Sequence, residues 1–322
     1  MRKATSWQRF AIFSGALCLL FFGLWFTKSA ETPPWRNLAD AGSRLNETPP
    51  QTRDKPKAQI PSFRFVTYNV KNWLSSSQNP DKSPKSKRAV IELLATSRAD
   101  VIGLSEIGDH SDVLEIQRML KAAGLDLPHF RYTGGIDPIR HLALLSSFPV
   151  LEQVKPEIKI SNTSFSMQRG ILDLTLQIGD SPVRFIGLHL KSKRTVPNLD
   201  EAQLRVAEAM HVRAHVDRIF KQSPNLPLVV YGDFNDHPKS LSSRTIIGSY
   251  RSPEYLFPVF AEDSRSEKWT HFYDFQDSYS RIDLVLVSKT LKPRVDRKKT
   301  RILDPPNWFT ASDHRAVLVH FE

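Results

Sequence analysis

Acidic, amide and imidazole side chains interrupt the apolar stretches of this sequence at several separate places. The clearest case is VVYGDFNDHP at residues 229–238, where an apolar run stops at Gly232 and is followed by Asp233 and Asn235. The other places carry the same residue types: Asn69, Glu106, His189, Asp283 and the pair Asp313–His314. A polar group buried without a partner is costly, so we expect these side chains to meet in one shared cluster.

The residue types in this predicted cluster suit the hydrolysis of a phosphate ester. Carboxylate and amide oxygens are hard ligands, which are the ligands that Mg²⁺, Mn²⁺ or Ca²⁺ prefer. A bound divalent cation neutralises charge on a phosphoryl oxygen and orients the attacking water, and histidines held by carboxylates transfer protons. Taken singly, each motif also has a structural explanation, since Asp313–His314 could form a capping turn and His189 could be a core histidine.

The elements that would position these residues alternate between strands and helices. Apolar runs and alternations predict strands at 63–70, 99–107, 170–178, 183–190, 226–235, 281–288 and 314–322. Apolar residues at helical spacing predict a helix over 85–98 and a longer one over 200–221. The turn residues GDSP predict a hairpin between the strands on either side of them. This pattern favours a single α/β or α+β domain with mixed sheets flanked by helices.

Six motifs, in this order, resemble those of the endonuclease/exonuclease/phosphatase superfamily: TYNV, GLSE, GLHLKS, YGDFND, RIDLVLVS and SDHRAVLV. The segment HLALLSSFPV is also similar to a segment of that family. The resemblance covers residues 63–322 and implies the deoxyribonuclease-I-like fold, a four-layer sandwich of two mixed β-sheets flanked by helices. It also implies a metal-dependent phosphoric ester hydrolase.

The resemblance implies a set of metal ligands. Glu106 is expected to be the main ligand, with Asn69 and Asp313 close to it, and the cation is expected to be Mg²⁺, Mn²⁺ or Ca²⁺. Lys71 departs from the pattern, because some members of the superfamily carry an acidic residue after NV. This departure argues against a second metal site.

The resemblance also implies catalytic roles. His314 is expected to act as the base that activates water, oriented by Asp283. Asp233 and Asn235 are expected to position the nucleophile or the phosphate. His189 is expected to contact the phosphate or to assist the leaving group.

Several residues around this cluster are assigned with less support from the motifs. The usual carboxylate partner of His189 is not evident, and Asp137 is a candidate for it. Arg140 could clamp a phosphate, and Lys191 and Lys193, which follow His189 directly, are predicted to contact the substrate.

Three other features are interpreted structurally. Asp236 is expected to close a turn, and Arg281 is an alternative partner for Asp283. His211 and His215 have a spacing that zinc can use, but they lack the glutamate of an H-E-x-x-H motif, so a surface pair is the interpretation.

The charge of the chain favours an anionic substrate. Lysine and arginine number 45 against 34 aspartates and glutamates, for a formal net charge of +11, and positive charge favours nucleic acid or other phosphate esters. This charge and the HLKSK run favour a nuclease that acts on DNA or RNA. One alternative is a phosphatase or phospholipase acting on sugar, inositol or lipid phosphates. Another is a catalytically silent binding module, which would lack at least one group of the cluster.

Residues 239–280 are expected to select the substrate, and no protein partner is predicted.

The N-terminus indicates export. Three basic residues precede an uncharged run from Phe10 to Phe26, a pattern typical of a signal peptide or a signal anchor over residues 1–30. Residues 31–61 are proline-rich and are predicted to be a linker, with the catalytic domain over 62–322. We therefore expect a secreted or membrane-anchored protein, with an inner-membrane tether at its N-terminus and its domain on the extracytoplasmic side. Cys18 is the only cysteine, which excludes an internal disulfide.

Overall fold

The computed structural model describes residues 60–75 and 82–322. The predicted leader at 1–30 lies outside these residues, as does the predicted linker except for Ile60 and Pro61. No helix in the described part of the chain is both long and apolar enough to cross a membrane. The N-terminal tether stays a prediction.

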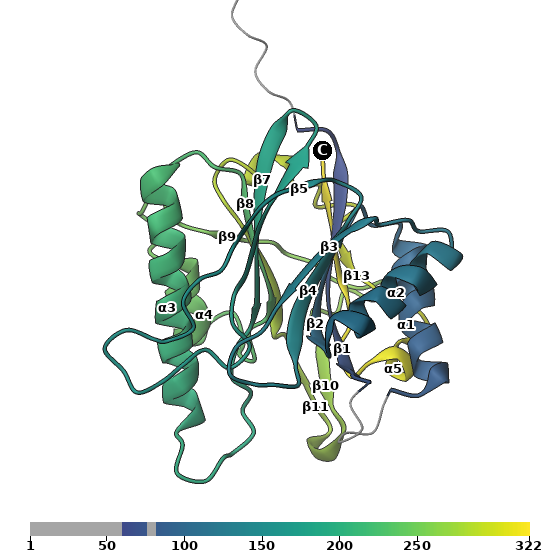
Figure 1. Cartoon of the computed structure of the whole chain (residues 1–322), viewed down its shortest axis with the longest axis horizontal. Helices are drawn as coiled ribbons and strands as arrows, with labels where there is room; N and C mark the ends of the chain where they lie inside the picture. Colours follow the sequence, from purple (N-terminus) through teal and green to yellow (C-terminus); the bar gives the residue numbers. More distant parts are fainter. Residues whose placement is uncertain (1–59, 76–81) are drawn as a thin grey trace, which may run out of the picture. The chain divides into compact units, whose positions relative to one another are not determined.

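Two six-stranded mixed sheets form the centre of the described structure (Figure 1). The first has the strand order β13–β14–β1–β2–β4–β3. Its strands are β1 (Phe63–Trp73), β2 (Val101–Ile107), β3 (His129–Thr133), β4 (His141–Ser146), β13 (Arg301–Ile302) and β14 (Val317–Phe321). The central strands β1 and β2 run parallel, and every other neighbouring pair in this sheet is antiparallel.

The second sheet has the strand order β5–β6–β7–β8–β12–β9. Its strands are β5 (Val150–Val154), β6 (Leu172–Ile178), β7 (Ser181–His189), β8 (Leu228–Asp233), β9 (Phe257–Pro258) and β12 (Asp283–Val287). Its parallel pair is β7 and β8, and its other neighbours are antiparallel. Each sheet is therefore built around one parallel pair, whose carboxyl ends lie at the same edge of that sheet.

Helices cover the outer face of each sheet. Figure 1 shows α1 (Pro84–Ser97), α2 (His110–Ala122) and α5 (Trp308–Ala311) on one side, and α3 (Glu201–Gln222) and α4 (Leu241–Ile247) on the other. Helix α1 begins where the Ser83 side chain accepts a hydrogen bond from the Ser86 amide, and α3 begins where Asp200 accepts from Ala202 and Gln203. The four layers confirm the predicted sandwich of two mixed sheets flanked by helices.

Alternate residues of strand β1 belong to two different hydrophobic cores. Phe63 and Phe65 of β1 belong to the core between the sheets, whereas Val66 and Tyr68 belong to the core under α1 and α2. The Phe65 ring lies 4.8 Å from the ring of Tyr231 on the opposite sheet, centroid to centroid. The two faces of β1 are therefore both buried, which holds the strand and its polar end rigidly.

Several short elements escaped the sequence prediction. Residues 239–280 contain α4, β9 and the hairpin of β10 (His271–Tyr273) and β11 (Ser278–Ser280), with the 3₁₀ turn η1 (Asp274–Gln276) at its tip. A second 3₁₀ turn, η2, spans Lys292–Arg294. Strands of two or three residues are too short for a periodic pattern. Helix α2 did carry a signal, because Asp109 and Asp112 form a capping box at its start.

Candidate active site

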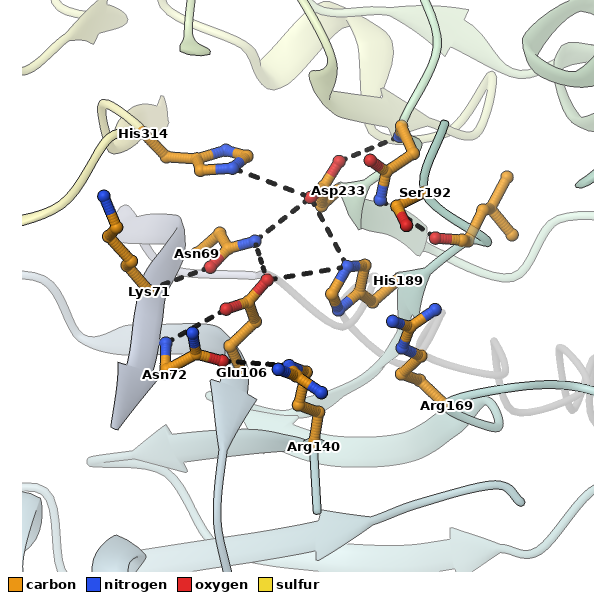
Figure 2. A network of polar contacts seen from close by, with 12 residues as sticks. Asn69, Lys71, Asn72, Glu106, Arg140, Arg169, His189, Ser192, Asp233 and His314 are labelled. Carbon is orange, nitrogen blue, oxygen red and sulfur yellow. Dashed lines mark hydrogen bonds and ion pairs between the residues drawn. The ribbon is translucent and has the colours of Figure 1, made fainter. Parts of the chain in front are cut away.

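The carboxyl ends of the two parallel strand pairs meet at one polar cluster (Figure 2). Asn69 of β1 donates its side-chain amide to Oε1 of Glu106 on β2 (3.2 Å) and to Oδ2 of Asp233 on β8 (3.0 Å). His189, at the end of β7, places Nε2 3.5 Å from the same Asp233 oxygen and 3.9 Å from Oε1 of Glu106. The structure thus brings together four residues that the sequence analysis selected from four different strands.

His314 joins the cluster from the loop before β14. Its Nε2 lies 3.8 Å from Oδ2 of Asp233, and its Nδ1 forms a 2.9 Å hydrogen bond with Oδ2 of Asp283. Its backbone amide donates to the Ser312 hydroxyl, which in turn donates to the backbone oxygen of Asn69 (2.8 Å). Burial would lower the pKa of His314, but the Asp283 charge and hydrogen bond outweigh burial and raise it to about 10. The imidazole is therefore a cation that can donate from Nε2.

The tip of β8 is shaped by backbone geometry. Gly232 has φ of 129°, and a Cβ there would lie 2.0 Å from the backbone oxygen of Leu188, so only glycine fits. Asn235 adopts φ of 51° and donates its backbone amide to Oδ1 of Asp233 (2.8 Å) and its side chain to the Leu190 oxygen (2.9 Å). Burial raises the pKa of Asp233 above its usual range. Asp233 is consequently a buried carboxyl that can accept a proton near neutral pH.

Glu106 sits at an irregularity of β2. Its φ is 64°, which is uncommon for a residue with a side chain, and the register with β4 shifts between Ser105 and Ile107. Its Oε2 accepts the backbone amide of Asn72 (3.0 Å), while Oε1 faces Asn69. Unusual backbone conformations of this kind cluster at functional sites, because the surrounding structure has to hold them.

Glu106 and Asp313 both lie close to one buried ammonium group. Burial lowers the pKa of Lys82 to about 8, although the neighbouring Asp313 and Glu106 carboxylates oppose that shift. Oδ2 of Asp313 also lies 3.1 Å from Nζ of Lys71. Both carboxylates offer hard oxygen ligands of the kind that a divalent cation such as Mg²⁺ prefers.

Asn69 does not offer a metal its oxygen in this arrangement. Its Nδ2 faces the carboxylates, and its Oδ1 accepts the backbone amide of Lys71 (3.0 Å). In this arrangement Asn69 holds Glu106 and Asp233 together, and its expected place among the metal ligands stays a prediction. Lys71 occupies the position after NV and pairs with Asp313. In the described residues, ligand atoms also gather within 4.8 Å of one another in two groups, Asp233–Asp283–His314 and His271–Asp313–His314.

The structure corrects the expected partner of His189. Asp137 binds two arginines instead: its Oδ2 lies 3.6 Å from Nη1 of Arg140 and 3.5 Å from Nε of Arg169. Nδ1 of His189 is buried and has no hydrogen-bond partner in the described residues. Burial lowers the pKa of His189 well below its usual range, and the charges of Arg169 and His314 lower it further. His189 is therefore neutral.

Arg140 and Arg169 line the His189 side of the cluster (Figure 2). Nε of Arg140 donates to Oδ1 of Asn72 (2.9 Å), the residue whose amide binds Glu106. Arg169 was missed by the sequence analysis. The only signal is its position just before the buried strand β6, in a loop that could not be placed without the fold.

The two lysines after His189, Lys191 and Lys193, make different contacts. Nζ of Lys191 donates to the backbone oxygens of Ser192 and Arg194 (both 3.0 Å), and the residue is buried. This geometry corrects its expected role in substrate contact. Lys193 is exposed and lies 3.2 Å from Oδ1 of Asp236.

The remaining motifs are structural. Asp236 accepts a hydrogen bond from the Ser242 hydroxyl (3.0 Å) and pairs with Arg205, so it fastens its turn as expected. His211 contacts the backbone oxygen of Glu157 (2.7 Å). The predicted surface pair is wrong for His215, which is buried and bonded to Asp173 at 2.6 Å. The alternative Arg281–Asp283 pair does not form, since Arg281 donates to the Val259 oxygen.

The comparison with protein families identifies the class. Residues 66–314 match the model of the Endonuclease/Exonuclease/phosphatase family. The match covers more than half of the chain, so the protein belongs to this family, which confirms the resemblance seen in the motifs. It is therefore an enzyme of the phosphoric ester hydrolase class, in a family that depends on divalent metal ions.

Solved structures share the fold at low sequence identity. Truncated TDP2 from Caenorhabditis elegans is 17% identical, with a TM-score of 0.58 over 81% of this chain and 97% of that one. The human Nocturnin catalytic domain, solved with a bound sulfate anion, is 17% identical, with a TM-score of 0.58 over 82% and 96%. Sphingomyelinase C from Streptomyces griseocarneus is 16% identical, with a TM-score of 0.57 over 81% and 100%. A comparison with curated protein sequences gave no match.

Proposed function

We propose that this enzyme is an exported, Mg²⁺-dependent nuclease that hydrolyses phosphodiester bonds of DNA or RNA by in-line attack of water. The observation that carries the proposal is the meeting of a cationic His314, a neutral His189 and a buried Asp233 beside the carboxylates of Glu106 and Asp313. Such a site combines a proton acceptor, a cationic hydrogen-bond donor and ligands for a divalent cation.

The charge states favour catalytic roles for His314 and Asp233 that differ from those expected from the motifs. His314 is already protonated, so we assign the acceptance of the water proton to Asp233, whose pKa burial raises. The water oxygen bonds to phosphorus as the ester P–O bond opposite it breaks, and the leaving oxygen takes a proton from solvent. His314 donates a hydrogen bond to a phosphoryl oxygen as its negative charge grows. A divalent cation held by Glu106 and Asp313 would neutralise charge on the phosphoryl and leaving oxygens.

A nucleic-acid substrate is supported by charge. The chain carries a formal net charge of +11, and Arg140 and Arg169 stand beside the cluster. A phosphatase or phospholipase activity is the second candidate, favoured by the structural similarity to a sphingomyelinase C. A silent binding module is less well supported, because every side chain that the proposed chemistry needs is present.

The proposed activity can be tested on the purified full chain with plasmid DNA, RNA, inositol phosphates and sphingomyelin, each in Mg²⁺ or in EDTA. We expect Mg²⁺-dependent cleavage of nucleic acid. His314→Ala should lose at least about 1,000-fold in kcat/KM, since it removes a cationic hydrogen-bond donor that stabilises the transition state. The matched control His320→Ala, on β14, should stay within about threefold. Metal-dependent turnover of the lipid or inositol substrates alone would replace the nuclease proposal with the second candidate.

We also propose export and tethering through residues 1–30. The basic residues followed by the uncharged run from Phe10 to Phe26 support this proposal. Residues 1–61 fused to a reporter that is active only outside the cytoplasm should give activity in the membrane fraction or in the medium. Activity confined to a cytoplasmic reporter would contradict it.

A further inference from the structure

Three buried nitrogen atoms beside the active site have no hydrogen-bond partner in the described residues. They are Nδ1 of His189 and Nη1 and Nε of Arg169, although Nε also lies 3.5 Å from the Asp137 carboxylate as an ion pair. The Arg169 side chain is only 11% exposed. Buried polar groups are nearly always hydrogen-bonded, so the unpaired donor Nη1 of Arg169 indicates a missing acceptor.

The local charge favours an anion as the missing acceptor. The two guanidinium groups of Arg140 and Arg169 share a single carboxylate, Oδ2 of Asp137, at 3.6 and 3.5 Å. Two cationic side chains therefore share one anion, which leaves an excess of positive charge beside His189.

The loops that carry the two arginines are packed against each other through their backbones. The amides of Ile136 and Asp137 donate to the oxygens of Met167 (3.2 Å) and Gln168 (2.8 Å). A Cβ at Gly135 would lie 2.3 Å from the Met167 oxygen, so this approach requires glycine. The arginines are held on a rigid support, which reduces the entropic cost of binding an anion.

The two arginines lie apart from the proposed hydrolytic centre. Nε2 of His189 faces Asp233 and Glu106, and Figure 2 shows Arg140 and Arg169 on the side of Glu106 and His189 that is away from His314. We propose that Arg140 and Arg169 form a subsite for a second phosphate group of the substrate, beside His189 and next to the phosphate that is hydrolysed. This inference rests on the proposed function, because the second phosphate is defined relative to the cleaved bond.

The chemistry of the donors favours a terminal phosphate over an internal one. Guanidinium groups bind phosphate oxygens through paired, charge-assisted hydrogen bonds. A terminal phosphate monoester carries a charge of about −1.5 to −2 at neutral pH and three acceptor oxygens, more than an internal diester offers. The subsite therefore predicts a preference for short nucleic acids that end in a phosphate beside the cleaved bond.

Phosphate binding tests the subsite without using activity. The full chain is titrated with inorganic phosphate in EDTA by calorimetry. We expect saturable binding that weakens about 10- to 100-fold in Arg169→Met, because a charge-assisted hydrogen bond to a buried group is lost. The control Arg251→Met, at an exposed site, should bind like the wild type. Equal binding in Arg169→Met, or no saturable binding in the wild type, would overturn the subsite.

Kinetics on matched dinucleotides test its role in specificity. Three substrates are compared in Mg²⁺: one without a terminal phosphate, one with a 5′-phosphate and one with a 3′-phosphate. One phosphorylated form should exceed the unphosphorylated form at least about tenfold in kcat/KM, and Arg169→Met should bring that ratio close to one. If Arg169→Met does not fold, Arg140→Met is tested in its place, because the Arg140 side chain is less buried, at 24% exposure.

The outcomes separate this inference from the proposed function. Hydrolysis of all three dinucleotides at equal rates by the wild type would overturn the subsite and leave the nuclease in place. No hydrolysis of any of them, with phosphate binding that depends on Arg169, would support the subsite and count against the nuclease.

Discussion

The two buried histidines of the active site differ in what holds their second ring nitrogen. Both direct Nε2 toward Oδ2 of Asp233, at 3.8 Å from His314 and 3.5 Å from His189. Nδ1 of His314 binds Asp283, whereas Nδ1 of His189 has no partner in the described residues. Burial lowers the pKa of both rings, but at His314 the Asp283 carboxylate reverses the effect. The carboxylates around His314, Asp283 first among them, and the cations around His189 thus give the same residue type opposite charge states.

The same contrast divides the whole site into two halves. The His314 half contains Asp283 and Asp313, whose carboxylate oxygens belong to groups of side chains that could hold a cation. The His189 half contains Arg140 and Arg169 with one shared carboxylate, so it favours an anion. A substrate phosphate placed between the halves meets positive charge on both sides once a divalent cation is bound, which suits the negative charge that builds during hydrolysis.

Asp283→Asn should have the largest effect on this contrast. Asparagine can still accept the Nδ1 hydrogen bond, but it removes the charge that raises the pKa of His314. The wild-type imidazole stays protonated up to a pH near 10, whereas the variant loses the proton at a lower pH. We expect kcat/KM to fall about 100-fold at pH 8 and far less at pH 5.5, where the variant is protonated as well. The pH profile of kcat/KM measures this difference.

A second buried Asp–His pair supplies the control for that prediction. His215 on α3 bonds to Asp173 at 2.6 Å, and Arg184 pairs with the same carboxylate. Asp173→Asn should reduce the free energy of unfolding and leave the shape of the pH profile unchanged. A loss for Asp283→Asn that is equal at pH 5.5 and pH 8 would show that the charge on His314 does not matter.

The sequence predicted the strands that carry the site better than it predicted the pairing within it. The runs that became β1, β2, β7, β8, β12 and β14 are long and apolar, and the polar residues near their ends mark a shared edge. The end of the first strand was misplaced. β1 continues past Asn69 to Trp73 through Lys71 and Asn72, both at positive φ, a backbone path that residue types do not reveal.

The sequence could not predict which charged side chains pair with each other, and the reason is physical. Asp137 and Arg169 meet only because two loops 32 positions apart pack backbone against backbone. Neither loop has a periodic pattern, so the sequence could not show that Arg169 lies near His189. Lys191 was misassigned because a lysine after a strand looks exposed, whereas its loop folds back over the ammonium group.

Glu208 supports the His189 half and allows a test that is smaller in effect. This fully buried carboxyl on α3 accepts the backbone amides of Gln168 (2.9 Å) and Lys191 (2.6 Å), the neighbours of the loops that present Arg169 and His189. Burial raises its pKa from 4.5 to about 7, against the opposing amide bonds and the charge of Arg169. The pKa of Glu208 is thus raised, whereas a neighbouring cation lowers the pKa of a carboxylate paired with it, because burial makes ionisation of Glu208 costly.

Glu208→Gln should change how stability depends on pH. Between pH 4.5 and 7 the folded protein keeps a proton on Glu208 that the unfolded chain has lost, so raising the pH through this window destabilises the wild type. The shift corresponds to about 3 kcal/mol across the window. The variant has no such group, so its free energy of unfolding relative to the wild type should rise by up to this amount from pH 4.5 to 7.5. Urea unfolding at several pH values measures it, and a constant difference between the two proteins would contradict the assignment.

Lys193→Met should have the smallest effect, because its ammonium group is outside both halves. The Lys193 side chain is 60% exposed, and its partner Asp236 is bound by Arg205 and Ser242 as well. Exposed ion pairs contribute about 0–1 kcal/mol and are screened by salt. We expect KM for nucleic acid to rise less than about threefold at 0.15 M salt, and the change to shrink further at higher salt. A larger change in kcat than in KM would place Lys193 at the reacting phosphate, and the anion-binding half would then extend beyond the buried arginines.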